Sequence, residues 1–90
     1  EKEELLNVFF IRVNEFELLK ESLEIQRENQ SSAKEIYKII REQFLNGSAS
    51  FTDISSVQTE VNRTTTEYFQ TVIELVTKYY EIKKLVFQEF

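Results

Sequence analysis

The near absence of residues that interrupt helices constrains this chain more than any other feature. Its 90 residues contain no proline and one glycine, Gly47, which lies close to the midpoint. Proline and glycine destabilise a helix interior more than any other residues do. Around the glycine, the segment QFLNGSASFTDISSV also gathers several serines, whereas charged and apolar residues alternate at helical spacing on either side. The sequence therefore predicts two long helices joined at a single point.

The first half of the chain carries two rows of a seven-residue repeat. The rows are Leu5, Arg12, Leu19, Gln26, Ala33 and Ile40, and Phe9, Phe16, Leu23, Gln30, Tyr37 and Phe44. Such rows are typical of a coiled-coil seam, here with polar members at Arg12, Gln26 and Gln30. A further row beside them consists of Ile11, Leu18, Ile25 and Ile39. The apolar face is therefore wider than a two-stranded coiled coil requires.

The second half of the chain also shows two apolar stripes. The first comprises Ile54, Val57, Val61, Tyr68, Val72, Leu75, Tyr79, Ile82 and Val86, and the second comprises Phe69, Ile73, Val76, Tyr80, Phe87 and Phe90. The threonines at 64–66 are weak helix formers, but the helical spacing continues through them, and packing can override propensity. Each helix thus has two apolar faces, and one partner helix cannot cover both.

Stop and start signals for helices lie only three residues apart in the middle segment. Gly47 suits the left-handed position just after a helix C-terminus. Ser50 followed by Asp53 fits a capping box at the start of the next helix. We therefore predict an all-α fold, a long antiparallel two-helix coiled-coil hairpin over residues 1–90. The expected helices span about 2–45 and 52–89, with the turn at about 46–51. In this register Phe16 faces Ile82.

Composition excludes most site chemistry. The absence of histidine and cysteine rules out a Ser-His-Asp triad, a thiol nucleophile and a thiolate or imidazole metal site. We therefore expect neither an enzyme nor a cofactor or metal. The net charge of −5 is spread evenly and includes no basic arm, which disfavours binding to nucleic acid. A chain that begins at Glu1 and contains no methionine is expected to be a fragment of a longer protein.

The order of residues around the turn matches a known family. The matching residues are Ala33, Tyr37, Phe44, Gly47, Ser50, Asp53, Gln58, Val61 and, further on, Tyr80. In this order they resemble the hairpin-tip motif of TolC-like outer-membrane efflux proteins. The resemblance covers most of the chain from Ala33 onward. Two positions depart from the family pattern, since Ser56 replaces a second aspartate and Ala49 replaces a frequent basic residue.

The resemblance implies a part in export. The intact protein would be a homotrimer whose hairpins form a periplasmic α-barrel beneath an outer-membrane β-barrel, so that this chain is the periplasmic portion and other segments make the membrane contact. The tip residues Gly47, Ser48, Ala49 and Ser50 would dock to a periplasmic adaptor protein, which works with an inner-membrane transporter to export small molecules. Asp53 would be the candidate for a pore constriction.

Two other functions fit the same helical pattern. The chain could be the hairpin of a periplasmic adaptor (membrane-fusion) protein, or a structural coiled-coil interaction module without a transport role. Whichever holds, the second apolar stripe is left uncovered in a lone hairpin. We therefore expect the isolated chain to self-associate, most simply as a dimer that forms a four-helix bundle.

Overall fold

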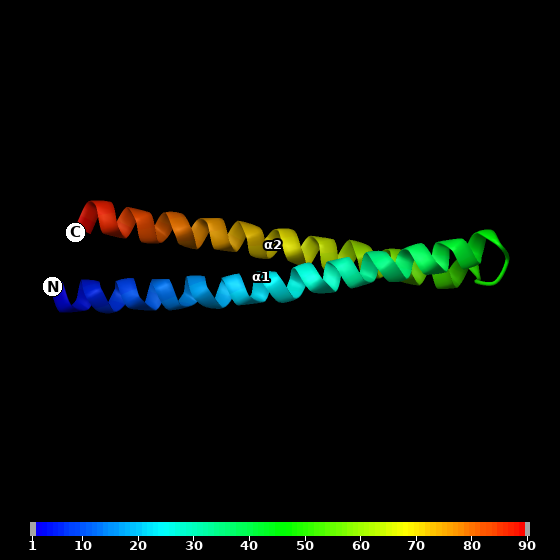
Figure 1. Ribbon diagram of the computed structural model, residues 1–90. Helices are drawn as coiled ribbons and strands as arrows, with labels where there is room; N and C mark the ends of the chain where they lie inside the picture. The colour runs from blue at the N-terminus through cyan, green and yellow to red at the C-terminus, as the bar shows by residue number, and fades with distance from the viewer. Residues whose placement is uncertain (1, 90) are drawn as a thin grey trace. The chain divides into compact units, whose positions relative to one another are not determined.

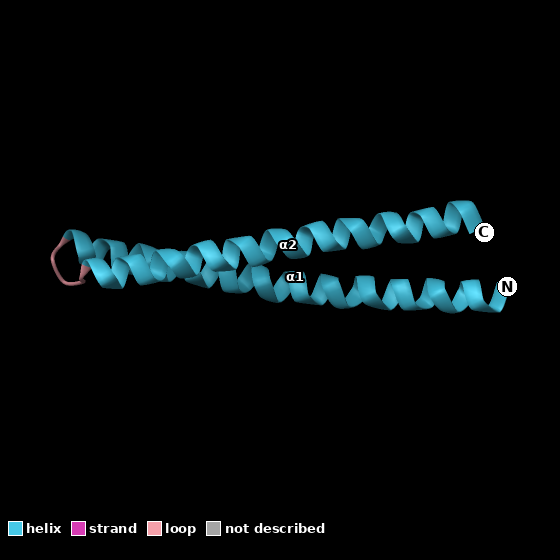
Figure 2. Cartoon of the chain, turned by 180° about the vertical axis from the view of Figure 1, so that it is seen from behind, coloured by secondary structure: helices cyan, strands magenta, loops and turns pink. Residues whose placement is uncertain are grey.

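The computed structural model describes residues 2–89 and contains two long helices. Helix α1 spans Lys2–Leu45 and helix α2 spans Phe51–Glu89. Figure 1 shows the two helices joined by one turn, and Figure 2 shows that this turn is the non-helical segment of the described chain, which holds no strand. The predicted all-α helical hairpin is confirmed. Helix α2 begins one residue before its expected start.

Residue contacts divide the hairpin into two compact units. One unit, here called the terminal unit, consists of the described residues up to Leu23 and from Gln70 onward. The other, here called the turn unit, consists of Glu24–Phe69. In each unit a segment of α1 runs antiparallel to a segment of α2, as the single connecting turn requires.

The seam on α1 follows the predicted repeat. The members of both rows are buried or half-buried except Phe44, which lies at the end of the helix and is exposed. Arg12, Gln26 and Gln30 therefore lie in the seam despite their polarity. The repeat of seven residues explains this placement, because it keeps each row turned toward the neighbouring helix whatever its individual members are.

The seam on α2 differs in part from the predicted stripe. Its two rows, each spaced by seven, are Ile54, Val61, Tyr68, Leu75 and Ile82, and Val57, Thr64, Thr71, Lys78 and Leu85. The sequence had suggested Tyr79 for the seam, but its side chain is 50% exposed. The hydropathy of threonine and lysine does not indicate burial. The sequence pattern therefore favoured Val72 over Thr71 and Tyr79 over Lys78, in each case the apolar residue one position later. The actual rows extend without interruption through the threonines at 64–66.

The most tightly packed part of the turn unit is made of small residues. Ala33 of α1 is 6% exposed and Thr64 of α2 is 4% exposed, and both line one shallow groove. The Thr64 hydroxyl donates within its own helix, to the carbonyl oxygens of Glu60 and Val61 at 2.9 and 3.0 Å. One turn away, the Gln30 side-chain amide donates to the Thr65 hydroxyl at 2.9 Å. Small side chains here allow the two helices to approach closely.

An ion-pair cluster joins the two helices in the terminal unit. Lys78 Nζ lies 2.8 Å from Glu15 and 3.4 Å from Glu81, and Arg12 lies 3.3 Å from Glu15 and 3.9 Å from Glu81. The hydrogen bond between Lys78 and Glu15 lowers the pKa of the Glu15 carboxyl and raises that of Lys78. Each of the two acids therefore contacts both bases. These ion pairs offset the cost of placing the charged side chains of Arg12 and Lys78 in the seam.

The register of the terminal unit differs from the expected one by about one helical turn. Phe16 was expected near Ile82, but its ring lies 6.4 Å from that of Tyr79, three residues earlier. Counting residues outward from the hairpin loop fixes the register between the two helices only to within one helical turn. Any seam residue can meet either of two partners on the facing helix, one helical turn apart. The ion-pair cluster accompanies the register that is observed.

A second apolar surface remains uncovered on each helix. On α1 the row of Ile11, Leu18, Ile25 and Ile39 is exposed, and on α2 the exposed set is Phe69, Ile73, Val76, Tyr80 and Phe87. Phe90, the last member of the predicted second stripe, lies outside the described residues. Among residues 2–88, Ala33 is the one apolar residue that is buried, at 6% exposed. A single hairpin thus leaves a row of large apolar side chains exposed to solvent on each helix.

Candidate docking tip

Helix α1 ends in a hydrogen-bonded glycine motif. Gly47 has a φ of +83°, the left-handed conformation expected from the sequence. Its N–H donates to the Phe44 carbonyl at 3.2 Å, and the next N–H, of Ser48, donates to the Gln43 carbonyl at 2.7 Å. These two bonds define a Schellman motif, which satisfies carbonyl groups left free at a helix C-terminus. The chain reverses direction here because glycine adopts this φ without steric penalty.

Helix α2 begins with the predicted capping box. The Ser50 hydroxyl accepts a hydrogen bond from the Asp53 N–H at 3.1 Å, and the Asp53 carboxylate accepts one from the Ser50 N–H at 2.9 Å. The hydrogen bond from the Ser50 backbone N–H, and after it the interaction of the carboxylate with the Ser50 side chain, lowers the pKa of the Asp53 carboxyl. The carboxylate also lies at the positive end of the helix dipole. Ser50 and Asp53 therefore fix the entry into α2.

Every backbone N–H from Asn46 to Ser50 has an acceptor within the turn. The Asn46 N–H donates to the Glu42 carbonyl, and the Ala49 N–H donates to the Gln43 carbonyl, while the Asn46 side chain gives Ser48 a second acceptor at 3.1 Å. Amides that are already paired have little to gain from a partner's backbone. The backbone N–H groups of this turn therefore contribute little to the binding of a partner.

Two exposed apolar side chains flank the turn. Leu45, the last residue of α1, is 69% exposed, and Phe51, the first residue of α2, is 73% exposed. The sequence prediction for the tip comprised Gly47, Ser48, Ala49 and Ser50 and missed both residues. The sequence did contain a signal for their exposure. Each of the two residues is apolar, adjoins the turn and lies outside the seam rows. Together with the four predicted residues they form the surface that we call the tip.

Asp53 is placed differently from the other predicted residues. Its carboxylate is exposed and carries a negative charge, as a residue at a pore constriction would, but one of its oxygens is already used in the capping box. Its proposed part in narrowing a pore requires several copies in one ring and stays a prediction.

Three further findings bear on the chain's function. No group of three or more metal-binding acidic side chains occurs among the described residues. Neither α1 nor α2 contains a stretch apolar enough to cross a membrane. No protein-family model matches the chain, and neither a curated protein nor a solved structure matches it.

Proposed function

We propose that this chain is a periplasmic helical hairpin of a trimeric outer-membrane export channel, and that its tip docks to a periplasmic adaptor protein. The observation that carries the proposal is the turn itself. Its backbone N–H groups are internally paired, and it presents exposed Leu45 and Phe51 beside small residues. A preformed turn with exposed apolar anchors can bind a partner without first losing conformational entropy.

The exposed rows on both helices support the same proposal. In an α-barrel each helix contacts a neighbour on two sides, so it needs an apolar row on each side. Here α1 has a seam and the exposed row of Ile11 to Ile39, and α2 has a seam and the exposed set of Phe69 to Phe87. The resemblance of the turn to TolC-like proteins supplies the rest of the proposal, namely the homotrimer, the inner-membrane transporter and the export of small molecules. The channel has no catalytic step.

The test uses the full-length parent protein in cells that lack the native copy. The probe is a fluorescent dye whose accumulation rises when the parent protein is absent. The tip variant Leu45→Ser/Phe51→Ser removes both exposed anchors without touching the seam. We expect it to reach the outer-membrane fraction in normal amounts and to raise dye accumulation close to the level of the deletion strain.

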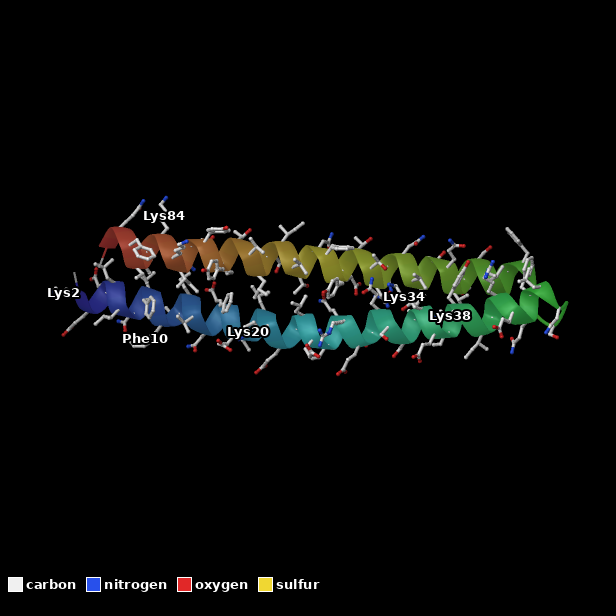
Figure 3. All side chains as sticks on the ribbon, turned by 45° about the horizontal axis from the view of Figure 1, so that its top comes forward. Lys2, Phe10, Lys20, Lys34, Lys38 and Lys84 are labelled. Atoms are coloured by element: carbon white, nitrogen blue, oxygen red, sulfur yellow. The ribbon has the colours of Figure 1, made fainter. Side chains whose placement is uncertain are left out.

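The matched control is Phe10→Ser, which removes a similarly exposed aromatic side chain of α1 outside the tip (Figure 3). We expect this variant to export the dye like the wild type. Normal export by the tip variant, or an equal loss in the control, would contradict the docking role. A parent protein found outside the outer-membrane fraction would instead favour the adaptor hairpin or a structural coiled-coil module.

A further inference from the structure

Two grooves flank the seam of the terminal unit, and they differ in chemistry. One is lined by Val8, Arg12, Glu81, Lys84, Leu85 and Gln88, and the other by Phe16, Leu75, Val76, Tyr79 and Tyr80. We call the second the aromatic groove. Four of its five residues belong to α2, and Val76, Tyr79 and Tyr80 are about half exposed. The exposed apolar surface of α2 thus lies on one flank of this unit, and a charged groove lies on the other.

The exposed row of α1 lies on the flank away from the aromatic groove. Ser32 continues the spacing of seven that relates Ile11, Leu18, Ile25 and Ile39, which we call the aliphatic row. Within the terminal unit, Val8 lines the charged groove and lies three residues before Ile11, so the two side chains are neighbours on the surface of α1. In this unit the aliphatic row therefore lies on the side of the charged groove, away from the aromatic groove.

The charges beside these two surfaces are opposite in sign. An acidic residue lies three positions after each of several members of the aliphatic row. At this spacing the acidic and the aliphatic side chains are neighbours on the helix surface. They are Glu21, Glu28 and Glu42, with Glu35 in the same row, and all four are exposed. The aromatic groove is instead bordered by lysines. Lys20 Nζ lies 5.7 Å from the centre of the Phe16 ring and 3.7 Å from the Glu17 carboxylate, which offsets part of its charge (Lys20 is labelled in Figure 3). Lys83 and Lys84 line a neighbouring hollow with Tyr80.

This arrangement distinguishes between the possible contacts of two copies. Contact between two aliphatic rows would bring the acidic rows of both copies together, and contact between two aromatic grooves would bring their lysines together. Like charges that face each other disfavour association. Contact between the aliphatic row of one copy and the aromatic groove of another places glutamates beside lysines and apolar side chains against apolar side chains.

We propose that the aromatic groove binds the aliphatic row of a second copy of this chain, with Ile11 and Leu18 as the inserted side chains. The two surfaces lie on opposite flanks, so a copy that uses one of them keeps the other free. In a bound pair, one copy therefore still offers its aliphatic row and the other its aromatic groove. Such an interface is heterologous and extends beyond two copies, as a ring if the rotation between copies closes and as an open filament if it does not. The proposal does not depend on a role in export, because it concerns the chain alone in solution.

The test uses two complementary variants of the 90-residue chain. The row variant is Ile11→Ser/Leu18→Ser, and the groove variant is Val76→Ser/Tyr80→Ser. All four side chains are about half exposed or more within a single copy, so their removal should leave the hairpin helical. Circular dichroism at low concentration checks this. Phe10→Ser serves as the matched control, because Phe10 is equally exposed but belongs to neither surface.

Sedimentation equilibrium measures the outcome at concentrations up to about 1 mM. We expect the wild type and the control to form species larger than dimers as concentration rises. Each variant alone should associate at least about a hundredfold more weakly, because two buried apolar side chains are lost per contact. An equimolar mixture of the two variants should form a one-to-one heterodimer and nothing larger, since only one intact row and one intact groove remain in each pair.

Several results would overturn the proposal. A wild type that stays monomeric over this range would show that no such contact forms. A wild type that stops at a dimer would favour the two-fold four-helix bundle expected from the sequence. Self-association of either variant alone at wild-type strength, without heterodimers in the mixture, would show that like surfaces pair with each other.

Discussion

Replacing Gly47 with alanine tests whether a left-handed residue holds the turn. Gly47 has a φ of +83°, and a Cβ at this position would meet no atom within 4 Å. The penalty is therefore conformational and amounts to about 1–2 kcal/mol for an L-residue in the left-handed region. Alanine also restricts the unfolded chain, which offsets up to about 0.4–1 kcal/mol. We expect a net loss of about 1 kcal/mol in the free energy of unfolding.

A series at the same position separates this cause from steric crowding. Asparagine tolerates positive φ better than other L-residues, so Gly47→Asn should lose less stability than Gly47→Ala. Gly47→Val should lose more, because a β-branched side chain is a marked outlier in this region. Ser48→Ala is the control at an exposed neighbouring position without positive φ, and its change should stay within about 0.5 kcal/mol.

Urea denaturation followed by far-ultraviolet circular dichroism provides the measurement. Each variant is examined at a protein concentration low enough that the midpoint no longer depends on concentration, so that self-association does not contribute. The reasoning fails if Gly47→Ala is as stable as the wild type, or if asparagine, alanine and valine give the same loss. Either result would mean that the turn adopts another conformation at this residue.

Two further predictions concern the capping box and the small-residue contact. Since the folded-state pKa of Asp53 is lowered, its stabilising contribution is present above its unfolded pKa of about 3.9 and is lost as the pH falls through the folded value. The unfolding free energy of Asp53→Asn should therefore fall less steeply than that of the wild type on acidification, and parallel curves would contradict this. Ala33→Leu should destabilise the hairpin by about 1–3 kcal/mol through overpacking against Thr64, whereas exposed Ser31→Leu should change it by less than about 0.5 kcal/mol. Equal urea midpoints for the two leucine variants would show that the helices are not in close contact there.

The fold could be predicted from the sequence because its signals are local. A single glycine, a serine three residues before an aspartate, and uninterrupted seven-residue rows each indicate structure within a few residues of themselves. The seam of α1 was predicted for the same reason. The capping box and the left-handed Gly47 are found as expected, since both depend on hydrogen bonds between near neighbours.

The remaining features depend on contacts between distant residues. Thr64, Thr71 and Lys78 belong to the seam of α2 because of what faces them, which their own hydropathy does not show. The register of Phe16 against Tyr79 depends on interhelical contacts that counting from the turn does not determine. At the tip, the exposure of Leu45 and Phe51 follows from how the ends of the helices are turned, and the sequence gives only their positions.

The hydrogen bonds of the Thr64 hydroxyl change how polar the seam is in the middle of the hairpin. Because its proton is engaged by carbonyl oxygens of its own helix, the side chain has little polarity left to offer across the seam. Towards the opposing backbone it therefore behaves much like valine. A hydropathy profile scores Thr64 as a polar interruption of the seam, whereas its side chain, with the hydroxyl already paired, packs there as an apolar residue would.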